Sequence, residues 1–132
     1  MYNGVYTKDQ YAYMYDTMFK WVRLKVEGQS IGERLRKSGI LHIALYGIND
    51  FGRLVYEDVK KDVCVDAFID RRARETPIVE GVKVLIPEET KSLPLECFVL
   101  VTAEFFFNDI TETLLQYGFD LDKIISIAMV LA

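Results

Sequence analysis

The chain contains the sequence Ile43-Ala44-Leu45-Tyr46-Gly47-Ile48-Asn49-Asp50-Phe51-Gly52-Arg53, in which a short apolar run ends in a glycine. A second glycine, Gly52, follows five residues later and opens an amphipathic segment. A strand, a tight turn and a helix N-terminus in this order hold phosphate groups in α/β proteins, because free backbone amides and the helix dipole favour an anion there. The stretch therefore predicts an α/β fold and a phosphate-binding site at the same place.

The turn matches two of the three glycines in the dinucleotide-binding pattern G-x-G-x-x-G. Gly47 would supply the tight turn and Gly52 the close packing of helix on strand, whereas Asn49 replaces the middle glycine. Asparagine tolerates left-handed backbone angles, so we expect the turn to persist. Asp50 would either cap the helix or compete with a ligand phosphate. The predicted cofactor-binding residues of this loop are Gly47, Ile48, Asn49, Asp50, Phe51, Gly52 and Arg53.

Three further residues complete the predicted cleft. Asp70 ends the second apolar run, 18 residues after Gly52, where an acid can accept hydrogen bonds from ribose hydroxyls or merely cap the next loop. Arg71 and its neighbour Arg72 could meet a 2′-phosphate or form a solvated charge run. Thr102, with Glu104, follows the fourth predicted strand and supplies the polar side chains of the remaining wall.

Apolar runs alternate with helical patterns after residue 40, which predicts a Rossmann-like three-layer α/β sandwich. We expect five parallel strands over residues 41–46, 63–69, 82–86, 98–102 and 124–127, in the order 3-2-1-4-5, with 71–80 as a loop. Helices are expected over 52–61, from Pro87, and over 106–117. The ligand cleft of such a sheet lies where the strand order reverses, between strands one and four.

Two predicted helices precede this unit, so we divide the chain into a helical extension, 1–39, and a nucleotide-binding domain, 40–132. The second helix begins with a capping box, Ser30 to Glu33. Helical spacing in the first helix predicts one apolar stripe that faces inward: Tyr11, Met14, Tyr15, Met18 and Trp21/Val22. This aromatic helix and the run Phe105–Phe107 are also candidates for pairing two subunits.

Composition narrows the function classes. The net charge is −4 over 132 residues, and the one dense basic cluster, Arg71, Arg72 and Arg74, lies beside acidic residues, which argues against nucleic-acid binding. The beginning, Met1-Tyr2-Asn3-Gly4, lacks the features of a signal peptide, and no apolar run approaches the ~20 residues of a membrane span. We therefore expect a cytoplasmic protein without membrane contact.

Metal and catalytic sites are not predicted. With one histidine and two cysteines, a zinc site cannot be assembled without carboxylates. Cys64 and Cys97 lie in apolar runs and are expected to be buried free thiols, and His42 is expected to be structural. No Ser-His-Asp, Cys-His or paired-carboxylate pattern is present, so no catalytic residue is named and enzymatic activity stays an open question.

The segment from Ile43 to about Ile127 resembles a family of small Rossmann-like domains in bacterial surface-glycan pathways. The likeness rests on Tyr46 to Arg53, Ala67-Phe68-Ile69-Asp70, Gly81-Val82-Lys83-Val84 and Pro87-Glu88-Glu89. It is similar to the N-terminal domain of sugar-amine acetyltransferases and the NAD-binding domain of polysaccharide-type nucleotide-sugar dehydratases. The resemblance implies a binding role for Gly47, Asn49, Gly52 and Asp70, while the family's separate catalytic domains have no counterpart in this sequence.

Three functions follow as hypotheses. The first is a binding module for a nucleotide, NAD(P) or a nucleotide sugar, linked to bacterial glycan biosynthesis and without a metal. The second is an interaction domain, such as a homodimer, that retains the fold and has lost the ligand. The third is the cofactor-binding part of an oxidoreductase or dehydratase.

Overall fold

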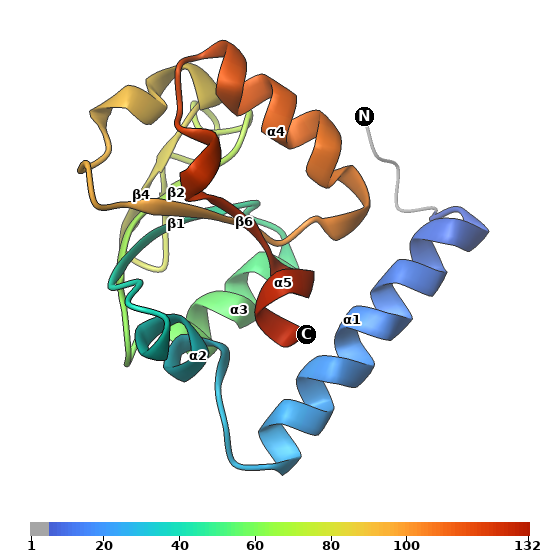
Figure 1. Ribbon diagram of the computed structural model, residues 1–132. Coiled ribbons are helices and arrows are strands. Elements are labelled where there is room, and N and C mark those ends of the chain that lie inside the picture. Colours follow the sequence, from blue (N-terminus) through green and yellow to red (C-terminus); the bar gives the residue numbers. More distant parts are fainter. Residues whose placement is uncertain (1–5) are drawn as a thin grey trace.

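A computed structural model describes residues 6–132 as an α/β protein with a mostly parallel six-stranded sheet (Figure 1). The strand order is β3-β4-β2-β1-β5-β6. The strands are β1 (His42–Tyr46), β2 (Cys64–Ile69), β3 (Ile78–Val79), β4 (Val82–Leu85), β5 (Phe98–Val101) and β6 (Ile124–Ser126). The α-helices are α1 (Lys8–Val26), α2 (Ile31–Lys37), α3 (Asp50–Val59), α4 (Phe107–Gln116) and α5 (Ile127–Leu131), and Pro87–Ser92 forms a 3₁₀ helix.

The sheet has one strand more than the predicted five. Strand β3 lies in the segment predicted to be a loop, and it pairs antiparallel with β4 through Val79 and Val82. The two residues between them, Glu80 and Gly81, both have positive φ angles, 54° and 76°. Two consecutive positive φ angles are typical of a type I′ hairpin turn, which usually contains Asn-Gly or Asp-Gly. Glu-Gly is a weaker sequence signal for such a turn, so the hairpin was not predicted. The prediction of a loop over residues 71–80 was therefore wrong where β3 lies.

Each face of the sheet carries its own hydrophobic cluster. On one face Ile43, Leu45 and Phe68 pack with side chains of α1, α2, α3 and α5. On the other face Ala44 and Val99 pack with side chains that include Leu114 of α4. In Figure 1, α4 accordingly lies above the sheet and α2, α3 and α5 lie below it. Strands buried on both faces explain why their sequences are almost continuously apolar.

The Asp58 carboxylate of α3 forms hydrogen bonds that hold the two N-terminal helices against α3. The Oδ2 atom of Asp58 accepts hydrogen bonds from the Trp21 indole at 2.9 Å and from the Ile31 amide at 3.0 Å. Its other oxygen pairs with Lys25. Since Trp21, Leu24, Ile31 and Leu35 belong to the same hydrophobic cluster as β1, residues before 40 contribute directly to the core.

The inward stripe predicted for α1 was wrong. Of its members only Trp21 is buried, with 8% of its surface exposed. Tyr15 is 73% exposed and Val22 is 55% exposed. The buried face instead runs through Gln10, Thr17, Trp21 and Leu24. Apolar residues occur all around α1, so helical periodicity could not choose the face, and the contacts of Trp21 with α3 decided it.

The helix ends also differ from the predictions in detail. Ser30 caps α2 by accepting a hydrogen bond from the Glu33 amide at 3.0 Å, while the reciprocal capping box occurs at α1, between Thr7 and Gln10. After β6 the chain forms the short helix α5, which the sequence analysis missed. Ser126 caps it by accepting from the Met129 amide at 3.2 Å.

Within residues 6–132 no helix is both long enough and apolar enough to cross a bilayer. Residues Met1 to Gly4, on which the expectation of no signal peptide rests, lie outside the described part of the chain.

Candidate functional site

The predicted loop lies between the end of β1 and the start of α3 and depends on its two glycines. Gly47 has a φ of +121°, a conformation that side chains disfavour, and a Cβ there would lie 3.1 Å from the Thr102 hydroxyl. A Cβ on Gly52 would collide with the Gly47 carbonyl oxygen and lie 3.1 Å from its carbonyl carbon. The first turn of α3 is thus pressed against the end of β1, as the sequence predicted for this pair of glycines.

The turn persists with asparagine at position 49, and Asn49 does not adopt a left-handed conformation there. It is the N-cap of α3 with φ −73° and ψ 178°, and its side chain makes no capping hydrogen bond. Asp50 is exposed in the first helical turn. The loop is held instead by Arg53, whose Nε donates to the Ile48 carbonyl oxygen at 3.0 Å.

Asp70 fastens this loop to the end of β2. Its Oδ2 accepts from the Ile48 amide at 3.3 Å, and its Oδ1 accepts from the amide and the Nε of Arg72 at 2.9 and 3.0 Å. Burial alone raises the pKa of Asp70, but the hydrogen bonds from Arg72 outweigh it and hold the pKa below its usual range. The carboxylate predicted to bind ribose is therefore already engaged within the protein.

Arg71 acts on Tyr46 through its charge, whereas Arg72 forms the ion pair with Asp70. Burial raises the pKa of the Tyr46 hydroxyl, and the positive charge of Arg71 opposes that shift. Of the two arginines after β2, Arg72 is thus the one that forms a bidentate contact with Asp70.

A pocket of about 200 Å³ lies next to the loop, where the carboxyl ends of β1 and β5 adjoin. Of the predicted cofactor-binding residues, Asn49, Phe51 and Thr102 line it, and the other seven do not. Thr102 donates its hydroxyl to the Tyr46 carbonyl oxygen at 3.0 Å, which ties the end of β5 to the end of β1. The chain connections leave β1 and β5 toward opposite sides of the sheet here, the usual place for a ligand in an α/β sheet.

The other walls of the pocket are aromatic and come partly from α1. Tyr13 contacts Phe105 edge to face, with 5.4 Å between ring centroids, and Phe105 contacts Phe106 in the same way at 5.2 Å. Sequence reasoning missed the contribution of α1, which includes Gln10 and Thr17. The sequence pattern that could have indicated it is the spacing of these two polar residues, seven positions apart on one helix face. In the structure both are buried.

The pocket has an acidic rather than a basic rim. Glu104 lines it and accepts from the Ala128 amide at 3.4 Å, while exposed Asp50 adjoins Asn49 at the helix start. Among the residues that line this pocket there is no lysine or arginine. The site therefore offers ring surfaces, an amide and a carboxylate to a ligand, and only the N-terminal amides of α3 favour a phosphate.

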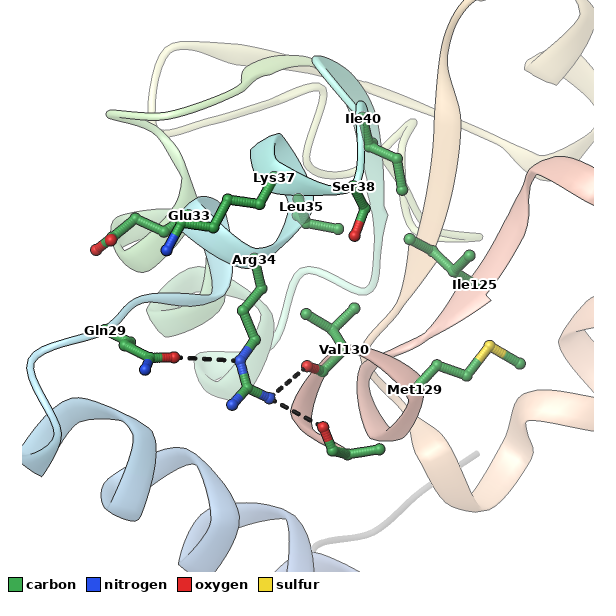
Figure 2. A pocket seen from close by; sticks show the side chains of 11 residues that line it. Gln29, Glu33, Arg34, Leu35, Lys37, Ser38, Ile40, Ile125, Met129 and Val130 are labelled. Carbon is green, nitrogen blue, oxygen red and sulfur yellow. Dashed lines mark hydrogen bonds between the residues drawn. The ribbon is translucent and has the colours of Figure 1, made fainter.

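A second, larger pocket of about 490 Å³ lies between α2, β6 and α5, and Figure 2 shows Arg34 reaching from α2 toward α5. The Arg34 guanidinium donates to the carbonyl oxygens of Val130 and Ala132 at 2.9 and 3.1 Å, and its Nε lies 3.4 Å from the Gln29 amide oxygen. None of the predicted site residues lines this pocket. Because these hydrogen bonds join α2 to α5, we assign Arg34 a structural role.

The two cysteines differ in environment. Cys97 is fully buried, as expected, but Cys64 is exposed, so its predicted burial was wrong. The Asp66 carboxylate raises the pKa of the Cys64 thiol through a hydrogen bond of 3.3 Å. Burial raises the pKa of Cys97 strongly, and Asp66 adds to that shift. Both thiols thus lie near the Asp66 carboxylate at the amino ends of the parallel strands, which we call the amino edge of the sheet. The opposite ends form its carboxyl edge.

No protein-family model matches the chain, and no curated protein is significantly similar to it in sequence.

Proposed function

We propose that the protein is a binding module for a nucleotide-type ligand, such as NAD(P) or a nucleotide sugar, on a Rossmann-like three-layer fold. One observation carries the proposal: the glycine turn Gly47–Gly52 presses the α3 N-terminus against the end of β1, directly beside an aromatic pocket. The pocket volume of about 200 Å³ is below the roughly 300 Å³ at which drug-sized ligand sites begin. It suits a base or sugar ring, with the phosphates outside it along the helix N-terminus.

The sheet arrangement supports the same proposal. The parallel strands run in the order β4-β2-β1-β5-β6, with β3 added at one edge. A doubly wound sheet of this kind binds ligands outside the carboxyl ends of its strands, at the reversal between β1 and β5. Asn49 and Thr102, on the two sides of that reversal, both line the pocket. A link to bacterial glycan biosynthesis rests on the sequence resemblance and is part of the proposal.

The first experiment is calorimetry on the whole chain with NAD⁺, NADP⁺, UDP-glucose, CoA and adenosine. We expect one of the phosphate-containing ligands to bind in a 1:1 ratio. Phe105→Ala removes a ring from the pocket and should weaken binding by about tenfold, within the 1–3 kcal/mol typical of base stacking on an aromatic side chain. Phe19→Ala is the matched control, since Phe19 is an exposed aromatic residue of α1 that does not line the pocket.

A second pair of variants tests where the phosphate lies. Asp50→Asn removes a negative charge from the first turn of α3 and should strengthen binding of a phosphate-containing ligand severalfold, with no change for adenosine. Asp122→Asn makes the same change before β6, at the other edge of the sheet, and should leave both affinities unchanged. Absence of any heat at millimolar ligand would refute the binding function.

An interaction domain is the second candidate, and the exposed side of α1 favours it. Tyr11, Tyr15 and Phe19 expose 56%, 73% and 51% of their surface, and Tyr15 stacks on Phe19. Phe105 and Phe106 are also about two-fifths exposed, which leaves the predicted pairing surface open. If two copies pair through α1, sedimentation should show a dimer that Tyr15→Lys dissociates. A monomeric mass at high concentration would exclude pairing of two copies and count against this function.

A further inference from the structure

Two neighbouring strands, β1 and β2, bring a histidine, a cysteine and an aspartate together at the amino edge of the sheet, opposite the aromatic pocket. The Nδ1 atom of His42 lies 3.1 Å from each carboxylate oxygen of Asp66, and the Cys64 thiol lies 3.3 Å from its Oδ1. One ligand atom from each residue can be chosen so that all three lie within 4.8 Å of one another. These residues start β1 and β2, where no role in the proposed nucleotide site involves them.

A strand irregularity directs Asp66 into this cluster. His42 pairs with Cys64 and Ile43 with Val65, but Ala44 pairs with Ala67, so Asp66 has no partner on β1. Bulges of this kind redirect one side chain and are common beside functional sites. The side chain of Asp66 is 13% exposed and that of His42 is 35% exposed, so solvent can reach the cluster.

The spacing is close to that of a tetrahedral metal centre. Zinc binds nitrogen and oxygen at about 2.0–2.2 Å and sulfur at about 2.3 Å, which places neighbouring ligand atoms roughly 3.3–3.7 Å apart. The two separations from Asp66, 3.1 Å to His42 Nδ1 and 3.3 Å to Cys64 Sγ, need to widen by tenths of an ångström, while the His42 and Cys64 ligand atoms lie within 4.8 Å of each other. A thiolate and a carboxylate would also neutralise both charges of a divalent ion.

A carboxylate near the other ring nitrogen of His42 is a second observation that supports a metal site. A metal-bound histidine usually donates its other ring N–H to a carboxylate, which fixes the tautomer and the ring orientation. The Nε2 atom of His42 lies 3.9 Å from Oε1 of Glu96, so a carboxylate stands on the required side of the ring. The Cys97 thiol, directly before β5, also faces Asp66, but it does not belong to the set within 4.8 Å.

We propose that His42 Nδ1, Cys64 Sγ and Asp66 bind a zinc-type divalent cation, with the fourth position open to water. On binding, the Cys64 thiol proton leaves to solvent, and neutral His42 carries its remaining proton on Nε2, toward Glu96. The thiolate selects a soft or borderline ion such as Zn²⁺ over Mg²⁺ or Ca²⁺, which prefer all-oxygen sites. No metal site was predicted, because one histidine and two cysteines are too few for zinc without carboxylates, and in this proposal Asp66 supplies that carboxylate.

Cobalt(II) substitution tests the site without reference to any activity. The reduced, chelator-treated chain is titrated with Co²⁺ at neutral pH while the visible and near-ultraviolet spectrum is recorded. We expect saturation at one equivalent, a thiolate-to-cobalt charge-transfer band, and its loss when Zn²⁺ is added. A spectrum without that band in the unmodified chain would overturn the proposal.

Variants assign the ligands. Cys64→Ser should abolish the charge-transfer band, and His42→Gln and Asp66→Asn should each lower Co²⁺ affinity by at least about tenfold. Cys97→Ser is the matched control and should retain the band. Retention of the band in Cys64→Ser, or its loss only in Cys97→Ser, would contradict the ligand set. Circular dichroism establishes that each variant is folded, and His42→Gln serves alone if Asp66→Asn is not.

Discussion

At the carboxyl edge of the sheet Asp70 accepts hydrogen bonds from Ile48 and Arg72, whereas at the amino edge Asp66 accepts them from His42 and Cys64. Asp70 binds two backbone amides and a guanidinium, so its role is to hold a turn. Asp66 is surrounded by side chains that can also bind a metal. Two carboxylates, one within β2 and one directly after it, thus have different partners: Asp70 contacts backbone amides and a guanidinium, and Asp66 contacts a histidine and a cysteine side chain.

The largest expected effect concerns the close approach at the carboxyl edge. Gly52→Ala should lower the free energy of unfolding by about 3 kcal/mol or more, because its Cβ meets backbone atoms of Gly47 that cannot move aside. Gly81→Ala is the control, since its φ is +76° with open space around the Cβ, and should cost about 1 kcal/mol. Denaturant titration compares the two, and equal losses would show that the close packing is unimportant.

The two carboxylates should differ in their contribution to stability. Asp70→Asn should cost about 2 kcal/mol, because it weakens charge-assisted hydrogen bonds to Ile48 and Arg72 in a buried position. Asp66→Asn should cost about 1 kcal/mol or less, since its partners His42 and Cys64 can turn to solvent. The same titration measures both changes. A larger loss for Asp66 would reverse the comparison.

Acid should remove the contribution of the Asp70 carboxylate to the free energy of unfolding. Its pKa in the folded chain is below the value of about 3.9 in the unfolded chain, so its contribution is fully present above that pH. It is lost as the pH falls through the folded pKa. The stability gap between the unmodified chain and Asp70→Asn should therefore be constant from pH 7 to about pH 5 and close below about pH 4. A gap that widens in acid would contradict the assigned ion pair.

A smaller effect is expected at the amino edge, in the reactivity of the Cys64 thiol. Because a hydrogen bond to Asp66 raises the pKa of the exposed Cys64 thiol, Asp66→Asn should lower that pKa and speed alkylation by iodoacetamide severalfold at pH 8. Cys97 is buried and should stay unmodified in both proteins. Mass spectrometry of the labelled chain gives the rates. An unchanged rate at Cys64 would show that Asp66 does not control the thiol.

The sequence predicted the glycine turn at the carboxyl edge because its evidence is local. Gly47 and Gly52 lie five residues apart, and the apolar run before them and the helical pattern after them are continuous in sequence. The same holds for the central strands, whose predicted ranges overlap the observed ones. The antiparallel strand β3 escaped prediction, since its turn has a glutamate in a conformation that glutamate rarely adopts.

The candidate site was predictable in part. Asn49, Phe51 and Thr102 were named from the strand ends and do line the pocket. Gln10 and Thr17 were not named, because they lie far before the glycine turn in sequence and reach it only when α1 packs against α5 and the Glu104–Phe106 turn. The exposure of Cys64 was also missed, since an apolar neighbourhood in sequence does not fix which end of a strand meets solvent.

By itself, therefore, the sequence determined the alternation of strands and helices, the glycine turn and the strand end at which a ligand is expected. These features depend on hydrophobic periodicity and on backbone angles that only glycine adopts easily. The tertiary structure alone decided which face of α1 is buried, which residues close the pocket, and that His42, Cys64 and Asp66 meet. Such contacts join residues more than 20 positions apart, and strand register, which local sequence does not encode, brings them within bonding distance.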